Sequence, residues 1–225
     1  MSAGEFAARP QLSEDVARFV RARIFDGTYA AGRYIRMEQL AAELGISVTP
    51  VREALFELRA EGLLIQQPRR GFVVLPVTRR DIADVSDVQA HIGGELAARA
   101  AANITDEQLG DLRAIQTRLE AAYDGDDDDL VVRLNHDFHR AINVAADSPK
   151  LAQLMSQITR YAPEAVFPTV SGWPARSIKD HRRILTALAK RDTDLARSAM
   201  SAHLAAGADP LIDHLIARGV IPKIR

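Results

Sequence analysis

The sequence has 225 residues, long enough for two modest domains, with 29 Lys and Arg against 30 Asp and Glu and no Cys. A net charge of −1 excludes a polycation that binds nucleic acid through bulk charge, and the lack of Cys excludes disulfides and thiolate metal sites. No apolar run is long enough to span a bilayer and no signal-peptide pattern opens the chain, so we expect a cytoplasmic protein without a membrane partner.

The N-terminal third of the chain predicts three helices. Apolar residues recur at helical spacing in Leu12–Phe25, where Ser13 can cap the helix start. The stretch Ile35–Glu61 predicts a short helix and a second helix separated by Gly45, because glycine enters the left-handed conformation that ends helices at little cost. Two short helices joined by a glycine turn are the arrangement that places a recognition helix in the major groove of DNA.

A β-hairpin is predicted after these helices. Residues Leu63–Leu75 contain two β-prone runs around a turn formed by Pro68, Arg69, Arg70 and Gly71. The hairpin therefore has a basic tip. Three helices followed by such a hairpin predict a winged helix-turn-helix domain over residues 1–76.

Arginine is the residue type that would contact DNA in this domain. Residues 1–78 contain ten Arg, no Lys and nine acidic residues, so affinity for DNA depends on where each Arg lies. Arg52 in the second helix is the first candidate for a base edge or a phosphate, because its guanidinium is a forked donor. The other candidates flank it or lie in the hairpin: Arg36, Ser47, Thr49, Arg69, Arg70 and Gly71. The alternative for each Arg is a solvated surface charge.

The rest of the chain, residues 79–225, predicts an all-helical bundle of about six helices, so the fold class is mostly α. The expected helices are Arg79–Asn103, Asp106–Gly125, Asp128–Ala146, Pro149–Tyr161, Ser177–Lys190 and Asp192–Ile216. The acidic run Gly125–Asp129 lacks the alternation and terminal Glu of a calcium loop, which favours a solvated turn and helix start. In the connector Ala162–Pro174, Phe167 or Trp173 either covers the mouth of a cavity or packs against the core.

Three histidines of the helical domain lie on or near inward-facing positions. His139 shares a helix face with Asn135 four residues earlier, and His181 and His203 lie among apolar residues of two further helices. Three imidazoles and an oxygen ligand with one open position would form a functional rather than a closed structural metal site. The spacing alone leaves open that these histidines are ordinary core residues. We expect His136 to be exposed and treat His91 and His214 as structural.

The N-terminal motifs resemble those of the GntR superfamily of bacterial transcription regulators. The matching text is LAAELGIS, TPVREAL, LRAEGLL and RRGFVV, in that order. The all-helical second half resembles the FCD branch, many members of which bind a divalent metal through Asp or Asn, a His four residues later and two further His. The resemblance assigns these roles to Asn135, His139, His181 and His203 and implies a divalent transition metal such as Zn, Ni or Mn.

Four positions depart from the pattern of that family. Val48 stands where relatives usually carry Arg, so the operator sequence cannot be transferred from them. Asn135 replaces the more frequent Asp, which changes the charge that compensates a bound cation. Gln89 and Gly93 stand where relatives frequently have Arg and Glu in the effector pocket. Gln89 is therefore our candidate effector-binding residue.

The function predicted from these features is a metabolite-responsive DNA-binding transcriptional regulator. We expect a homodimeric repressor that binds a palindromic operator in double-stranded DNA and is released by a small carboxylate-type organic acid effector bound near the metal. Two alternatives come from other functional classes. A metal-dependent hydrolase would need a general base, and neither a His-Glu-x-x-His motif nor a clearly placed base is present. A helical interaction module would make the histidines incidental. We predict no enzymatic activity.

Overall fold

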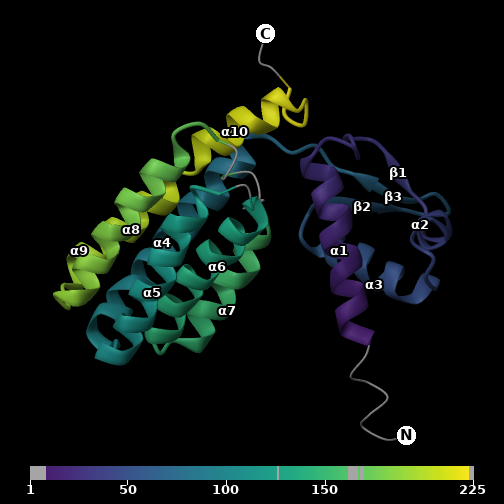
Figure 1. The fold of residues 1–225 in the computed structure, drawn as a ribbon. Helices are drawn as coiled ribbons and strands as arrows, with labels where there is room; N and C mark the ends of the chain where they lie inside the picture. Colours follow the sequence, from purple (N-terminus) through teal and green to yellow (C-terminus); the bar gives the residue numbers. More distant parts are fainter. Residues whose placement is uncertain (1–8, 126, 162–166, 168–169, 223–225) are drawn as a thin grey trace, which may run out of the picture. The chain divides into compact units, whose positions relative to one another are not determined.

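The computed structural model describes residues 9–125, 127–161, 167 and 170–222, and it divides into two compact units (Figure 1). One unit comprises Met1–Arg79 together with Leu215–Arg225, and the other comprises Arg80–His214. The sequence had assigned the whole of 79–225 to the second domain. The segment after His214 instead joins the first unit, where Ile221 is buried and Gly27 lies so close to the Arg218 carbonyl that a Cβ would be 2.9 Å from it.

The first unit contains the winged helix-turn-helix that the sequence predicted. Its elements are α1 (Arg9–Phe25), β1 (Tyr34–Ile35), α2 (Met37–Leu44), α3 (Val48–Ala60), β2 (Leu64–Gln67) and β3 (Gly71–Val74). The strands form an antiparallel sheet in the order β1-β3-β2. The two-residue strand β1 was not expected, because two residues are too few to show an alternating pattern.

Packing of α1 on α3 holds the helices of the first unit together. Val20 of α1 and Leu55 and Leu58 of α3 are fully buried in this core. At its edge, Arg21 donates two hydrogen bonds to Glu61, at 3.1 and 2.6 Å, and both side chains are largely shielded from water. A bidentate ion pair of this kind fixes the end of α3 relative to α1.

Two glycines of the first unit occupy conformations that other residues adopt with strain. Gly45 ends α2 in the left-handed conformation with φ of 66°. Gly71 has φ of 98°, and a Cβ on it would lie 2.5 Å from the Ile35 carbonyl oxygen. Glycine at position 71 thus allows β1 to pair with β3.

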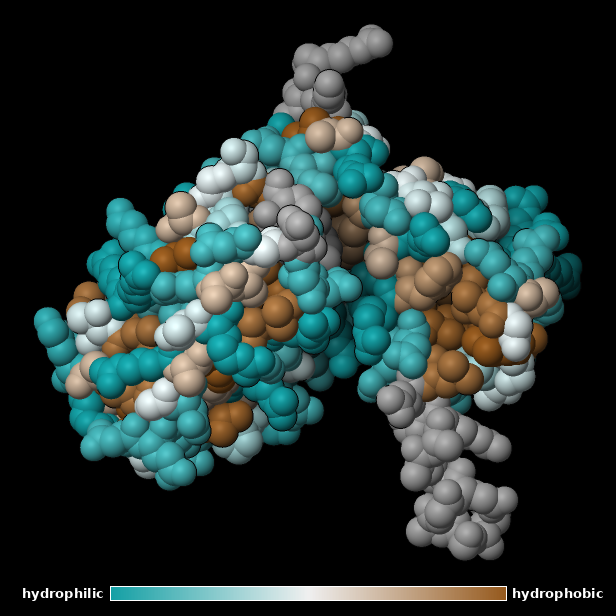
Figure 2. Space-filling model, viewed as in Figure 1, coloured by the Kyte–Doolittle hydropathy of each residue, from teal (hydrophilic) through white to brown (hydrophobic). Residues whose placement is uncertain are grey.

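The second unit is built from helices. They are α4 (Arg79–Asn103), α5 (Asp106–Ala122), α6 (Asp128–Ala145), α7 (Pro149–Ile158) with the 3-10 turn η2 (Thr159–Tyr161), α8 (Trp173–Ala189), α9 (Thr193–Ala205) and α10 (Ala208–Ala217). The first residue of α4 and the last three of α10 are grouped with the first unit. Hydrophilic residues cover most of the visible face of these helices, with apolar side chains showing between them (Figure 2). Within the described residues, none of the helices combines the length and the apolar character needed to cross a bilayer.

Two of the expected helices differ substantially from the observed ones, whereas the other helices of this unit end within three residues of the expected position. The helix expected over Asp192–Ile216 is interrupted and forms α9 and α10. Gly207 lies at the break, where a Cβ would be 3.2 Å from the Phe167 ring. The helix expected from Ser177 begins earlier, at Trp173. Pro174 lies in its first turn, where a missing N–H costs nothing, and was wrongly taken as part of the connector.

Side-chain caps explain where α5 and α6 begin. Thr105 and Gln108 form a capping box at the start of α5. Asp127 accepts a hydrogen bond from the Leu130 amide at 2.8 Å and caps α6, while Asp128 and Asp129 occupy the first turn of that helix. The described part of the acidic run therefore starts a helix, as expected; Asp126 lies outside the described residues.

Candidate functional site

The second helix of the helix-turn-helix, α3, has one buried face and one exposed face. Pro50, Val51, Ala54, Leu55 and Leu58 are buried, whereas Ser47, Thr49 and Arg52 are exposed. Ser47 is the N-cap residue, but its side chain makes no capping hydrogen bond. Arg52 therefore lies on the exposed face of α3, with two hydroxyl side chains near the start of the same helix.

The turn between β2 and β3 carries the other basic candidates. Arg69 and Arg70 are exposed, and Arg69 has φ of 63°, a left-handed conformation that is uncommon for a residue with a side chain. Gly71 has the structural role described above, and its predicted contact with DNA stays a prediction. Arg36 is exposed at the start of α2. Arg59, near the end of α3, differs from Arg52 because it donates to Gln66 at 3.0 Å and lies over the Phe56 ring.

In the second unit, the three predicted histidines converge although they come from three helices. His139 lies on α6, His181 on α8 and His203 on α9, and one nitrogen of each lies within 4.8 Å of the others. His203 Nε2 is 3.3 Å from His181 Nε2 and 3.4 Å from His139 Nε2. Separations of about 3.3 Å are those expected between nitrogens that share a tetrahedral metal ion at about 2.0–2.1 Å. The donor set therefore fits a divalent transition metal.

Neighbouring side chains orient the imidazole rings. The His181 ring stacks on Phe138 with centroids 4.0 Å apart and an interplanar angle of 5°, and its Nδ1 lies 2.9 Å from Gln116 Oε1. His203 Nδ1 lies 3.5 Å from Asp180 Oδ2, too far for a well-formed hydrogen bond, so that the carboxylate faces the Nδ1 side of the ring. These contacts engage the Nδ1 atoms of His181 and His203 and leave their Nε2 atoms facing the cluster, an arrangement typical of metal-binding histidines.

Burial keeps His139 and His181 uncharged. Desolvation, reinforced by the neighbouring His203 and His136, lowers the pKa of His139 to about 3. Desolvation also lowers the pKa of His181 well below its ordinary value, with His203 and His139 adding to the effect. Near neutral pH both imidazoles are therefore neutral and keep a lone pair, which is the form that binds a metal.

Sequence reasoning missed Gln116 and Asp180, the residues that contact the rings of His181 and His203. Asp180 is adjacent to His181 in sequence but approaches a histidine of another helix, so spacing along α8 gave no signal. Gln116 is 3% exposed and lies between Leu112 and Leu119 on the buried face of α5. A polar residue on an otherwise apolar helix face was the available signal for Gln116.

A cavity of about 610 Å³ lies beside the histidines. His139, His203 and Asn135 line it, and Asn135 lies one helical turn before His139 on α6. Phe167 and Trp173 also line the cavity and stack on each other with centroids 4.5 Å apart. Both aromatic residues thus belong to the cavity wall.

The two departures from the family pattern in α4 shape this cavity. Gln89 is buried, lines the cavity and donates from Nε2 to the Ile158 carbonyl oxygen at 3.3 Å. Gly93 lies against Leu204 of α9, whose Cδ1 would be 2.3 Å from a Cβ at position 93. Leu204 therefore occupies the space that a glutamate side chain at position 93 would need, and it contributes an apolar side chain to the cavity wall.

Comparison with known proteins identifies both units. Residues 12–74 match the family model described as bacterial regulatory proteins, gntR family, and residues 84–206 match the FCD domain model. An uncharacterized HTH-type transcriptional regulator of Bacillus subtilis, YdhC, is 28% identical over 186 residues, which cover 80% of this chain and 82% of the relative. A probable D-xylose utilization operon transcriptional repressor of Paenarthrobacter nicotinovorans is 28% identical over 199 residues, which cover 88% of each chain.

A solved structure shares the fold. The structure of McbR/YncC from E. coli superimposes with a TM-score of 0.71 and 23% sequence identity, covering 90% of this chain and 97% of the other. At that sequence identity the likeness establishes the fold alone. What this chain binds has to be inferred from its own residues.

Proposed function

Because the chain belongs to the gntR family of bacterial regulatory proteins and carries an FCD domain, we propose that it is a transcriptional repressor controlled by an organic acid bound beside a metal ion. The relatives are transcription regulators, so the metal-dependent hydrolase considered from the sequence is excluded. The convergence of three histidines argues against a simple helical interaction module.

The proposed DNA-recognition surface is the exposed face of α3. Arg52 projects from this face with Ser47 and Thr49 near its start, and a guanidinium there can reach guanine edges or phosphates. Arg69 and Arg70 in the wing, and Arg36 before α2, would contact the sugar-phosphate backbone. Since one recognition helix reads few base pairs, the proposal includes a homodimer on a palindromic operator.

His139, His181 and His203 would hold a divalent transition metal through their Nε2 atoms, and Asn135 would add an amide oxygen. Four neutral ligands leave the charge of a divalent ion uncompensated, and such an ion, when bound, attracts an anionic group to its open position. Imidazole ligands favour Zn or Ni over Mn. The observation that supports this part of the proposal is the convergence of three Nε2 atoms, two of them on His139 and His181, which burial keeps neutral.

The cavity beside the cluster would hold the effector. Among its described lining residues, Arg140 is the only Arg or Lys, while Phe167, Trp173, Met155 and Leu204 provide apolar surface. One guanidinium and one open coordination position on the metal suit an acid with a single carboxylate better than an acid with several carboxylates. We therefore propose an organic acid with one carboxylate and an apolar body, with Gln89 in the wall beside it.

Linkage between two binding events would provide the regulation. The acid would bind better to the conformation of the FCD domain that is found in protein without DNA, and it would thereby weaken operator binding. DNA would in turn weaken binding of the acid by the same factor. The same free energy of coupling governs both changes.

The test is operator binding measured by fluorescence anisotropy on DNA from upstream of the protein's own gene. The metal-loaded protein should bind this DNA more tightly than a scrambled fragment of equal length, and an organic acid should release it. Equal affinity for both fragments would refute the proposed recognition. Release that persists after a chelator has removed the metal from folded protein would refute the role of the metal.

A further inference from the structure

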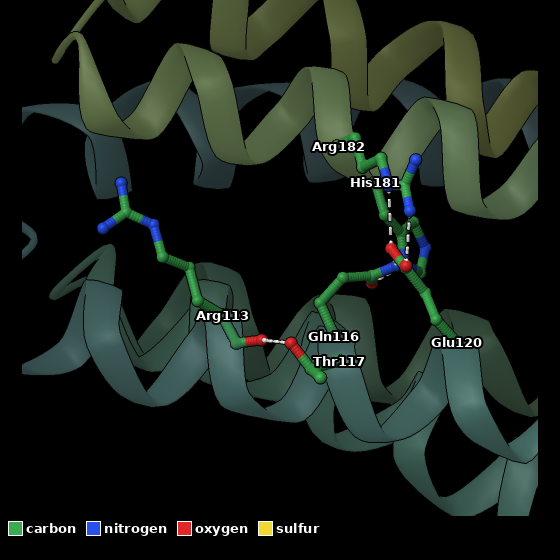
Figure 3. A network of polar contacts seen from close by, with 6 residues as sticks. All are labelled: Arg113, Gln116, Thr117, Glu120, His181 and Arg182. Carbon is green, nitrogen blue, oxygen red and sulfur yellow. Dashed lines mark hydrogen bonds and ion pairs between the residues drawn. The ribbon is translucent and has the colours of Figure 1, made fainter.

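A chain of polar side chains leads from the surface of the second unit to the ring of His181 (Figure 3). Arg182, exposed on α8, donates from Nε and Nη2 to the two carboxylate oxygens of Glu120 at 2.9 and 2.5 Å. Glu120 Oε1 accepts a hydrogen bond from Gln116 Nε2 at 2.9 Å. Gln116 Oε1 in turn lies 2.9 Å from His181 Nδ1. The chain thus runs from α8 to α5 and back to α8.

Each contact in this chain determines the next one. Glu120 is ionised, because the hydrogen bond from Arg182 lowers its pKa, and an ionised carboxylate only accepts hydrogen bonds. Gln116 must therefore turn its NH₂ group toward Glu120 and its carbonyl oxygen toward the histidine. Since that oxygen cannot donate, the proton of the neutral His181 ring must reside on Nδ1. The lone pair is then on Nε2, the atom that lies 3.3 Å from His203 Nε2.

We propose that Gln116, oriented by Glu120 and Arg182, is a positioning residue that fixes His181 in the Nδ1–H tautomer and so presents its Nε2 lone pair to a metal ion. The inference rests on the metal site proposed above and adds a residue that provides no ligand atom. Without Gln116, the ring could carry its proton on Nε2, and that proton would have to leave before a metal could bind.

Other neighbours of His181 already fix the orientation of its ring, so the property that depends on Gln116 is the tautomer. Stacking on Phe138 with an interplanar angle of 5° already sets the plane of the ring. His181 and Gln116 are 0% and 3% exposed, so bulk water does not take the place of the amide as acceptor. A purely structural role would not depend on which Gln116 atom faces the ring, whereas the proposed role does.

The test compares Gln116→Leu and Glu120→Ala with Thr117→Val as the matched control. Thr117 is the next residue on α5, is exposed, and donates to the Arg113 carbonyl oxygen at 3.0 Å without joining the chain to His181 (Figure 3). Long-range ¹H–¹⁵N NMR spectra of the metal-free proteins identify the His181 tautomer. Competition with a chromogenic chelator gives the affinity for Zn²⁺.

Wild type and Thr117→Val should show the Nδ1–H tautomer and equal affinity for Zn²⁺. Gln116→Leu should show a mixture of tautomers and bind Zn²⁺ about 10–100-fold more weakly, the range measured for losses of residues that orient metal ligands. Glu120→Ala should change both properties in the same direction. Because Glu120 acts through Gln116, the double variant should bind Zn²⁺ no more weakly than Gln116→Leu alone.

An Nε2–H tautomer in wild type, or wild-type affinity in folded Gln116→Leu, would overturn the proposal. If Gln116→Leu does not fold, Glu120→Ala provides the same comparison, and an unchanged tautomer and affinity there would count equally against it. A different result would contradict the proposed metal site itself, namely a wild-type protein that binds no Zn²⁺.

Discussion

The imidazole of His139 on α6 stacks against that of His203 on α9, with ring centroids 5.2 Å apart and an interplanar angle of 18°. Their Nε2 atoms are 3.4 Å apart, although 64 positions separate the residues in sequence. Because these two Nε2 atoms approach the same point, a direct hydrogen bond between them requires a proton on one of the two atoms. A cation at that point would account for the geometry, and the first prediction follows from it.

Metal analysis of the purified protein should find about one divalent transition metal ion per chain. His139→Ala and His181→Ala should lose it, whereas His91→Ala, which changes an exposed histidine of α4, should keep it. Adding Zn²⁺ should raise the melting temperature of wild type and of His91→Ala only, because a ligand that binds the native state stabilises that state. Equal metal content in all four proteins would contradict the assignment.

Replacing Arg52 by Ala should reduce affinity for the operator by about 5–150-fold, the equivalent of the roughly 1–3 kcal/mol carried by one good base contact. Fold and oligomeric state should not change, because Arg52 is exposed. Arg18→Ala is the control, since it removes an exposed arginine from α1, outside the recognition helix. Anisotropy titrations would show the difference, and an Arg52→Ala protein with wild-type affinity would contradict the assignment of α3.

The wing arginines should contribute through phosphates. A protein with Arg69→Gln and Arg70→Gln should bind specific and scrambled DNA more weakly by similar factors. The slope of log affinity against log salt concentration should become shallower by about 2, close to one unit for each lost phosphate contact. An unchanged slope would show that the two side chains stay in solvent.

The metal-free protein should become less stable as the pH falls. His139 has a folded-state pKa of about 3, below the ordinary value of 6.5, so the unfolded chain binds more protons in this window and stability decreases from about pH 6.5 downward. For this group alone the loss between pH 7 and pH 5 is about 2 kcal/mol. His181, whose pKa burial also lowers, adds to this loss, and His203, His136 and Asp180 are further ionisable side chains close to these two rings.

Urea denaturation of chelator-treated protein at pH 7 and pH 5 would measure this loss. His139→Phe should show a smaller loss than wild type, because it removes one group that must stay unprotonated. A loss of the same size in both proteins would mean that other groups dominate the acid response.

Organic acids with one carboxylate and an apolar body should raise the melting temperature of the metal-loaded protein more than citrate at equal concentration. Arg140→Gln should reduce this shift, because it removes the only Arg or Lys among the described residues of the cavity wall. Arg183→Gln, an exposed arginine of α8 outside the cavity lining, is the control. A larger shift with citrate would contradict the proposed effector class.

Local sequence signals predicted most helix boundaries, because caps and spacing act within one or two turns. Thr105 and Asp192 start helices as expected, and Gly45 ends α2. Two boundaries were missed. At the break between α9 and α10, Gly207 lies against the Phe167 ring, a contact distant in sequence, whereas α8 starts directly after Gly172, whose φ of 77° is known only from the folded backbone.

The amino-acid sequence by itself determined the order of the elements and the inward-facing positions of three histidines, because helical periodicity places a side chain on a face of its own helix. Only the tertiary structure decided that these three rings meet, that Gln116 and Asp180 contact two of them, and that Leu204 fills the space beside Gly93. Those relationships depend on how helices cross one another, and crossing is set by the packing of whole helix surfaces rather than by spacing along any one of them.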